Sequence, residues 1–255
     1  MNSRNANLIP PSANLTSAGT DLTPTLSLSR RGWRVTAGEV FCLLFLLLFP
    51  FSTYSFTVVI DAGHGGTEKG AVQGSLIEKD LSLRLARKIQ TRLAKRPGIR
   101  AVMTRGEDRT LPIEERARAI AEAKADLFLS IHFNIDVFML AETRGLEIYY
   151  PADDLANAPE ESLSLYHRNN RSFAFGKMMR DRYLKSELFT VWKHDLNMFA
   201  QRDLKIFRLT ATPGLLLEIG YLTSPDDRAH IENEQFLDDM AAFIAETVVE
   251  QAGKK

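Results

Sequence analysis

The chain has 255 residues, of which 45% are hydrophobic and 25% are charged, a composition typical of globular proteins. This composition excludes a wholly disordered chain, a collagen-like repeat and a coiled coil. The 32 basic and 32 acidic residues balance, so the chain shows no electrostatic footprint for nucleic acid. The single cysteine, Cys42, excludes an internal disulfide and a cysteine-rich zinc cluster.

The first 55 residues have the pattern of an export signal. Residues 1–29 show no helical or strand period, residues 30–34 contain three arginines, and residues 40–51 are an apolar run followed by small residues. Twelve helical residues rise about 18 Å, less than the roughly 30 Å of a bilayer core. We therefore expect a signal peptide over 1–55 and no stable membrane span after its cleavage, with an uncleaved anchor as the alternative.

The sequence is compatible with two export routes. Residues 29–35 resemble a twin-arginine signal, with Trp33 in the aromatic position after the paired arginines. The strongly apolar core that follows is more typical of the general secretory route.

From residue 56 onwards, strand and helix patterns alternate. Strands are predicted at 56–60, 99–104, 127–133, 146–150, 205–209 and 215–219, and helices at 80–95 (capped by Asp80), 112–125, 172–184, after Ser224 and at 235–250. No repeat or second linker divides this region. It is predicted to be a single α/β domain over 56–255, with three layers and a central, mostly parallel or mixed sheet flanked by helices.

Three candidate metal ligands lie at strand ends or in the loops after them: His64, Glu78 and His132. Such positions can converge at the carboxyl edge of an α/β sheet. Two imidazoles and one carboxylate are a ligand set of catalytic zinc, which keeps a further position open. The spacing alone is weak evidence. Taken singly, His132 fits a hydrogen-bonded core histidine and Glu78 a solvated acid.

Glu218 lies in a strongly apolar predicted strand, where an ionised carboxylate is costly unless it is paired or close to a metal. A buried salt bridge to an arginine is one interpretation. If a metal site lies nearby, Glu218 becomes the natural general base for a water molecule.

Six ordered blocks resemble the zinc-dependent N-acetylmuramoyl-L-alanine amidases of the Amidase_3 family, and the resemblance extends over about residues 56–250. The blocks lie at 61–66, 70–80, 104–108, 125–134, 145–150 and 217–224. The resemblance implies one zinc ion held by His64, Glu78 and His132, with Glu218 as catalytic acid and base.

The resemblance also implies a reaction and a partner. The substrate would be peptidoglycan or its muropeptide fragments, cut at the amide between N-acetylmuramic acid and L-alanine of the stem peptide. Asn134 and Arg202 are candidates for orienting the substrate, and an activator protein is a further candidate partner. The alternatives are a zinc peptidase acting on stem peptides and a non-catalytic wall-binding module.

The export signal and the substrate class are independent observations that agree on location. Both place the protein outside the cytoplasm, and we expect the periplasm, with secretion or attachment to the cell wall as the alternative.

Overall fold

The computed structural model describes residues 55–138, 143–152, 162–186 and 198–254. The predicted signal peptide lies outside this part of the chain, apart from Ser55. None of the described helices is long and apolar enough to cross a membrane.

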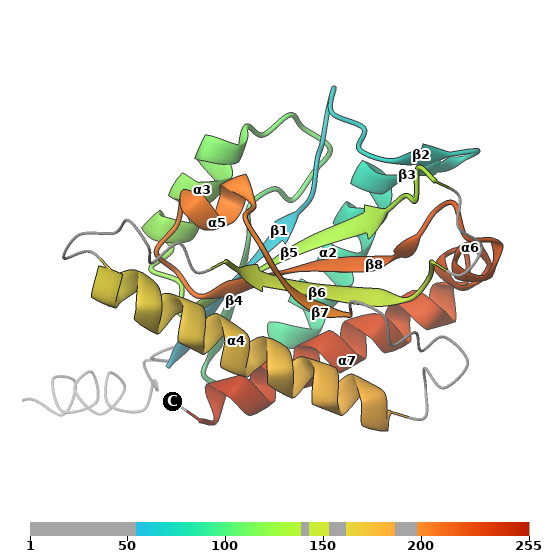
Figure 1. The fold of residues 1–255 in the computed structure, drawn as a ribbon. Coiled ribbons are helices and arrows are strands. Elements are labelled where there is room, and N and C mark those ends of the chain that lie inside the picture. The colour runs from blue at the N-terminus through green and yellow to red at the C-terminus, as the bar shows by residue number, and fades with distance from the viewer. Residues whose placement is uncertain (1–54, 139–142, 153–161, 187–197, 255) are drawn as a thin grey trace, which may run out of the picture. The chain divides into compact units, whose positions relative to one another are not determined.

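A six-stranded sheet forms the centre of the domain (Figure 1). Its order is β4 (Ile99–Met103), β1 (Phe56–Ala62), β5 (Leu127–Asn134), β8 (Gly214–Tyr221), β6 (Leu146–Pro151) and β7 (Phe199–Arg202). The first four strands are parallel to one another. Strand β6 runs antiparallel to β8, and β7 runs parallel to β6. The predicted mixed, mostly parallel sheet is therefore confirmed.

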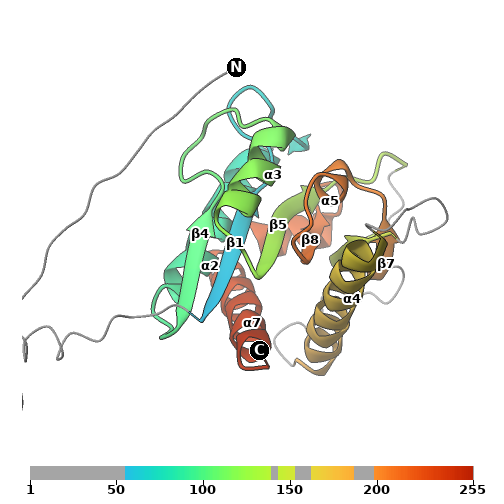
Figure 2. The same cartoon turned by 90° about the vertical axis from the view of Figure 1, so that its left-hand side faces the viewer.

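Helices cover both faces of the sheet, which confirms the predicted layered domain (Figure 1; Figure 2). One face packs against α2 (Glu78–Leu93), α4 (Ser162–Lys185) and α7 (Glu234–Ala252). The other packs against α3 (Ile113–Glu122) and α5 (Lys205–Arg208). The central strands read as nearly continuous apolar runs because both of their faces are buried.

Three smaller features complete the fold. A two-stranded hairpin, β2 (Val72–Gln73) and β3 (Leu76–Ile77), leads into α2 and was not expected from the sequence. Helix α6 (Pro225–Ile231) begins as predicted after Ser224, whose hydroxyl accepts the Asp227 amide. Asp80 does not cap α2, because the helix begins two residues earlier, at Glu78.

The predicted strand at 205–209 is wrong, because residues 205–208 form α5. Ile206 and Phe207 are both buried against the α3 face, as consecutive residues of a short helix can be. Buried Arg168 donates to the carbonyls of Phe207 and Thr210 and so holds this turn in place. The strand of this region is instead β7, which is short and half-exposed and therefore gives a weak periodic signal.

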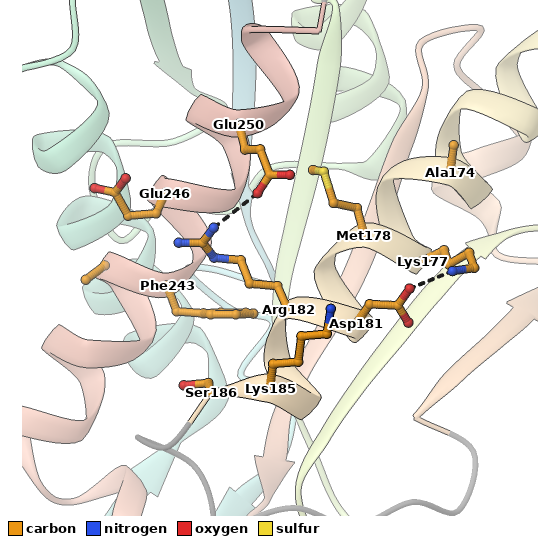
Figure 3. A pocket seen from close by; sticks show the side chains of 11 residues that line it. Ala174, Lys177, Met178, Asp181, Arg182, Lys185, Ser186, Phe243, Glu246 and Glu250 are labelled. Atoms are coloured by element: carbon orange, nitrogen blue, oxygen red, sulfur yellow. Dashed lines mark hydrogen bonds and ion pairs between the residues drawn. The ribbon is translucent and has the colours of Figure 1, made fainter.

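A groove of about 780 Å³ lies between α4 and α7 (Figure 3). Met178 and Phe243 contribute apolar surface to it, and Arg182 pairs with Glu250 at 3.1 Å. The groove is bordered by these two helices and includes none of the predicted site residues, so it is separate from the chemistry described next.

Candidate active site

His64 lies in a tight loop directly after β1, at a backbone φ of +54° that non-glycine residues rarely adopt. Two buried arginines hold the carbonyl groups of this loop. Arg105 donates to the carbonyls of Ala62 and Gly63, at 3.0 and 2.7 Å. Arg116 donates to the carbonyls of Ala62 and His64. These bonds fix the unusual backbone that turns His64 towards the site.

The buried carboxylate of Asp61 forms an ion pair with Arg116. Its Oδ1 atom accepts from Arg116 at 2.8 Å and from the Thr104 hydroxyl at 2.6 Å, and its Oδ2 accepts from the Ser130 hydroxyl at 2.7 Å. Burial acts to raise the pKa of Asp61, but Arg116 and the two hydroxyls hold it below its usual value. The ion pair between Asp61 and Arg116 is therefore well hydrogen-bonded, and its guanidinium also holds the carbonyl group of His64.

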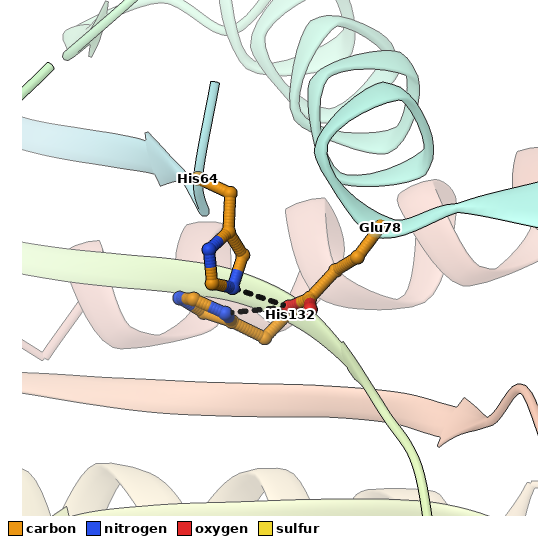
Figure 4. A group of neighbouring side chains, drawn as sticks. All are labelled: His64, Glu78 and His132. Carbon is orange, nitrogen blue, oxygen red and sulfur yellow. Dashed lines mark hydrogen bonds and ion pairs between the residues drawn. The ribbon is translucent and has the colours of Figure 1, made fainter. Parts of the chain in front are cut away.

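Glu78, the first residue of α2, joins the two histidines (Figure 4). Its Oε1 atom lies 3.1 Å from Nε2 of His64 and 2.8 Å from Nδ1 of His132. Its Oε2 accepts the Ala71 amide at 2.7 Å, which fixes the carboxylate. The structure thus brings all three predicted ligands together from the loop after β1, from α2 and from β5.

The geometry of this cluster fits a zinc ion. One donor atom from each side chain lies within 4.8 Å of the others. Ligands about 2.0–2.1 Å from a tetrahedral ion are about 3.3 Å apart, close to the separations around Glu78. Burial acts to raise the pKa of Glu78, but the two histidines lower it to about 2, so the carboxyl group is ionised near neutral pH and could serve as an anionic ligand.

Two glycines make room for the cluster. A Cβ atom at Gly63 would lie 2.5 Å from Cε1 of the His132 ring. A Cβ atom at Gly70, whose φ is +67°, would lie 2.3 Å from Oε2 of Glu78 and 2.6 Å from Cδ2 of His64. Any larger residue at these positions would therefore displace a candidate ligand.

Glu218 lies beside the cluster, where β8 pairs His132 in register with Glu218. The side chain is partly exposed, but its Oε2 atom is covered and has no hydrogen-bond partner among the described residues. Burial raises its pKa to about 7. His132 opposes this effect, and the nearby carboxylates of Glu78 and Glu147 add to it. A carboxylate in this state can accept a proton near neutral pH.

The predicted substrate residues lie at strand ends. Asn134 ends β5 on the same edge as the cluster, whereas Arg202 ends β7, which runs parallel to β6 and therefore ends at the opposite edge. Asn134 accepts the Ile135 amide through Oδ1 and donates through Nδ2 to Glu147 at 3.0 Å. The guanidinium of Arg202 is exposed and lies 4.8 Å above the Tyr149 ring. Asn134 thus contacts Glu147 and Arg202 contacts Tyr149, and neither contacts the His–Glu–His cluster in a described hydrogen bond or ion pair.

Sequence reasoning did not assign a role to Glu147, Arg105 or Arg116. Glu147 pairs in register with Glu218 from the antiparallel strand β6 and is 7% exposed. The available signal was the same as for Glu218, a carboxylate inside an apolar strand. The arginines, Arg105 in the loop after β4 and Arg116 in α3, gave no such signal, because arginine is usually solvated.

Comparison with known proteins identifies the family of the chain. Residues 58–250 match the family described as N-acetylmuramoyl-L-alanine amidase, Amidase_3. The chain is 31% identical over 180 residues to the uncharacterized protein YqiI of Bacillus subtilis, covering 71% of this chain and 77% of YqiI. It is 29% identical over 193 residues to the N-acetylmuramoyl-L-alanine amidase LytC of Bacillus subtilis, covering 76% of this chain but 35% of LytC.

A solved structure gives the same result. The catalytic domain of CwlV, an N-acetylmuramoyl-L-alanine amidase from Bacillus (Paenibacillus) polymyxa var. colistinus, superposes with a TM-score of 0.65 at 28% identity, over 78% of this chain and 99% of that domain. The chain therefore belongs to the Amidase_3 family of N-acetylmuramoyl-L-alanine amidases, which are hydrolases of peptidoglycan.

Proposed function

We propose that this amidase uses one zinc ion, held by His64, Glu78 and His132, to cleave the amide between the lactyl group of N-acetylmuramic acid and L-alanine. The observation that carries the proposal is the convergence of three donor atoms within 4.8 Å, next to a carboxylate oxygen that has no partner in the described structure. A zinc ion there would polarise the scissile carbonyl and make a water molecule more acidic.

Glu218 is the proposed proton carrier. Its carboxylate takes a proton from the water whose oxygen attacks the carbonyl carbon, and the same carboxyl group then gives that proton to the alanine nitrogen as the C–N bond breaks. The products are a lactyl carboxylate on the sugar and a free amine on the stem peptide. The pKa of about 7 suits both directions of transfer.

Asn134 and Arg202 are proposed to align the substrate. Asn134 gives one Nδ2 hydrogen to Glu147 and has a second, which can donate to a carbonyl of the substrate. Arg202 presents an exposed cation held over Tyr149, which suits a carboxylate of the stem peptide.

The test is to incubate the purified chain with muropeptides, with and without a chelator, and to identify the products by mass. We expect glycan that carries free lactyl groups together with intact stem peptides, lost on chelation and restored by zinc. Shortened peptides still attached to sugar would identify a zinc peptidase instead. Binding without cleavage in a zinc-free protein would identify a wall-binding module, and cleavage that appears only with an added protein would identify an activator.

The periplasm remains the proposed location, with residues 1–55 as the proposed export signal. A cell-wall substrate supports a site outside the cytoplasm. Cell fractionation, together with the amino-terminal sequence of the exported protein, tests both. An amino terminus at residue 56 would support cleavage, and an intact residue 1 would support an uncleaved anchor.

A further inference from the structure

The outer surface of α2 and the turn after it carries a concentration of positive charge. Residues 81–100 contain seven basic side chains and no acidic one, although the chain as a whole has 32 of each sign. Leu85, Ile89 and Leu93 bury the inner face of the helix, so the basic residues lie on its exposed or half-exposed side. A local surplus of this size in a neutral chain creates a positive field at one surface.

Helix α7, which lies beside α2, compensates this charge only in part (Figure 2). Four cations share three acidic partners: Arg84 and Lys88 pair with Glu234, Lys88 and Arg92 with Asp238, and Arg96 with Glu246. The acidic side chains are 40–59% exposed, so these pairs are screened by solvent and hold little of the positive field back.

A groove of about 350 Å³ opens beside this row of pairs and is lined by Arg87, Lys88, Thr91, Arg92 and Lys95, with one acid, Asp238. Arg87 and Lys95 are exposed, and neither forms an ion pair among the described residues. Arg87 donates through Nε to the carbonyl of Gly106 at 3.1 Å, which holds its guanidinium at the groove. Four cations around one small groove suit phosphate groups, which guanidinium and ammonium groups both bind.

The groove lies close to the point where residues 1–54 join the domain. The amide and hydroxyl of Ser55 donate to the carbonyl of Gly98, at 2.8 and 3.2 Å, only three residues after Lys95. The apolar run of the predicted export signal ends at residue 51, and four residues span at most about 14 Å. While that run is in a membrane during export, the bilayer surface is therefore within reach of this end of the domain.

The candidate active site is at the other end of the same helix. Glu78 begins α2 and Arg92 is near its last residue, about 21 Å further along the helix axis. A flat surface that contacts the groove therefore leaves the His–Glu–His cluster facing away from it. For an enzyme whose substrate is the cell wall, that orientation turns the cluster from the membrane towards the substrate.

We propose that the groove lined by Arg87, Lys88, Thr91, Arg92 and Lys95 is a peripheral membrane-binding surface for the phosphate groups of anionic phospholipids. The attraction is electrostatic and needs no inserted helix. Each basic side chain at an anionic bilayer surface strengthens binding about fivefold. The contact forms while the export signal is in the membrane and persists after that signal is removed.

The test is binding of the exported protein, purified from the cell envelope, to vesicles of phosphatidylcholine with and without phosphatidylglycerol. We expect Arg87→Gln combined with Lys95→Gln to weaken binding to the anionic vesicles about tenfold or more, because two contacting cations are lost. Arg87→Lys combined with Lys95→Arg keeps the charge and should bind as the wild type does. Arg118→Gln combined with Lys205→Gln, which removes the same charge from the α3 face, is the matched control.

A retained apolar run would bind vesicles by itself, so contact of the groove is measured separately. A fluorophore is attached through Thr91→Cys or through Gln73→Cys, each with Cys42→Ser, and the vesicles carry a lipid with a quencher on its headgroup. Thr91 lines the groove, whereas Gln73 is exposed in the hairpin that leads into α2 at Glu78. We expect quenching at Thr91 but not at Gln73, lost between about 0.1 and 1 M salt as the Debye length falls from about 10 to 3 Å.

Three results would overturn the inference: equal quenching at both positions, no quenching at Thr91, or a neutralised groove that binds as well as wild type. Binding of soluble polyphosphate that depends on Arg87 and Lys95, without binding to anionic vesicles, would also overturn it and identify a soluble polyanion as the partner. Thermal unfolding of every variant separates a lost fold from a lost contact. The assay needs neither zinc nor turnover, so its failure and the failure of the proposed function are distinguishable.

Discussion

Gly63→Ala is a direct test of how the loop after β1 makes room for His132. The added Cβ atom would lie 2.5 Å from Cε1 and 2.7 Å from Nδ1 and Nε2 of the His132 ring. Carbon atoms in contact are normally about 3.5–4.0 Å apart, so the ring has to move by about 1 Å. Metal–ligand distances tolerate only about 0.2 Å, so we expect zinc affinity to fall by about 10- to 100-fold or more.

The assay is zinc competition against a chromogenic chelator, with thermal unfolding of the metal-free protein measured alongside. Gly106→Ala is the matched control, because a Cβ atom there has nothing within 4 Å and the residue does not have a positive φ. We expect that control to bind zinc as the wild type does. Wild-type affinity in Gly63→Ala would refute the argument that His132 occupies the space above this glycine as a ligand.

Three further predictions follow from the site. Glu218→Gln is expected to keep its zinc, measured by metal analysis, while turnover of muropeptides falls by about 10²- to 10⁴-fold. In the metal-free protein, Glu218 has a pKa raised from 4.5 to about 7, so it contributes stability that is complete below about pH 4.5 and is lost as the pH rises through 7. The unfolding temperature of wild type relative to Glu218→Gln should therefore fall between about pH 5 and pH 8, and a constant difference would contradict the raised pKa. Arg116→Met leaves Asp61 buried without its cation and should cost about 3–5 kcal/mol in denaturant unfolding, whereas exposed Arg118→Met in the same helix should cost little.

The fold was predictable because its strands and helices have strong periodic patterns. Strands buried on both faces, such as β5 and β8, are apolar almost throughout, and this pattern predicts a layered α/β domain. Short elements were not predictable in the same way. Residues 205–208 hold two adjacent apolar residues between two basic ones, a pattern too short to distinguish a strand from a helical turn, and both apolar side chains are buried against the α3 face.

The residues of the candidate site were likewise only partly predictable from the sequence. His64, Glu78 and His132 were named from residue type, position and the family resemblance, and the structure places their donor atoms together. The position of Glu147 depends on cross-strand register, which places it opposite Glu218 and within hydrogen-bond distance of Asn134. Register is a property of the assembled sheet, so a single strand does not encode it.

The reversed direction of β6 divides the connecting segments of the domain between the two ends of the sheet. Because β6 is antiparallel to β8, its first residues lie beside the last residues of the parallel strands, where the His–Glu–His cluster is located. The described residues that follow β1 and β5, and those that precede β6, are therefore at that rim, whereas 123–126 and 209–213 lead into β5 and β8 from the opposite rim. Substrate preference can thus be re-engineered through one set of loops, while affinity tags or surface-attachment sites are introduced through the other without approaching the reaction.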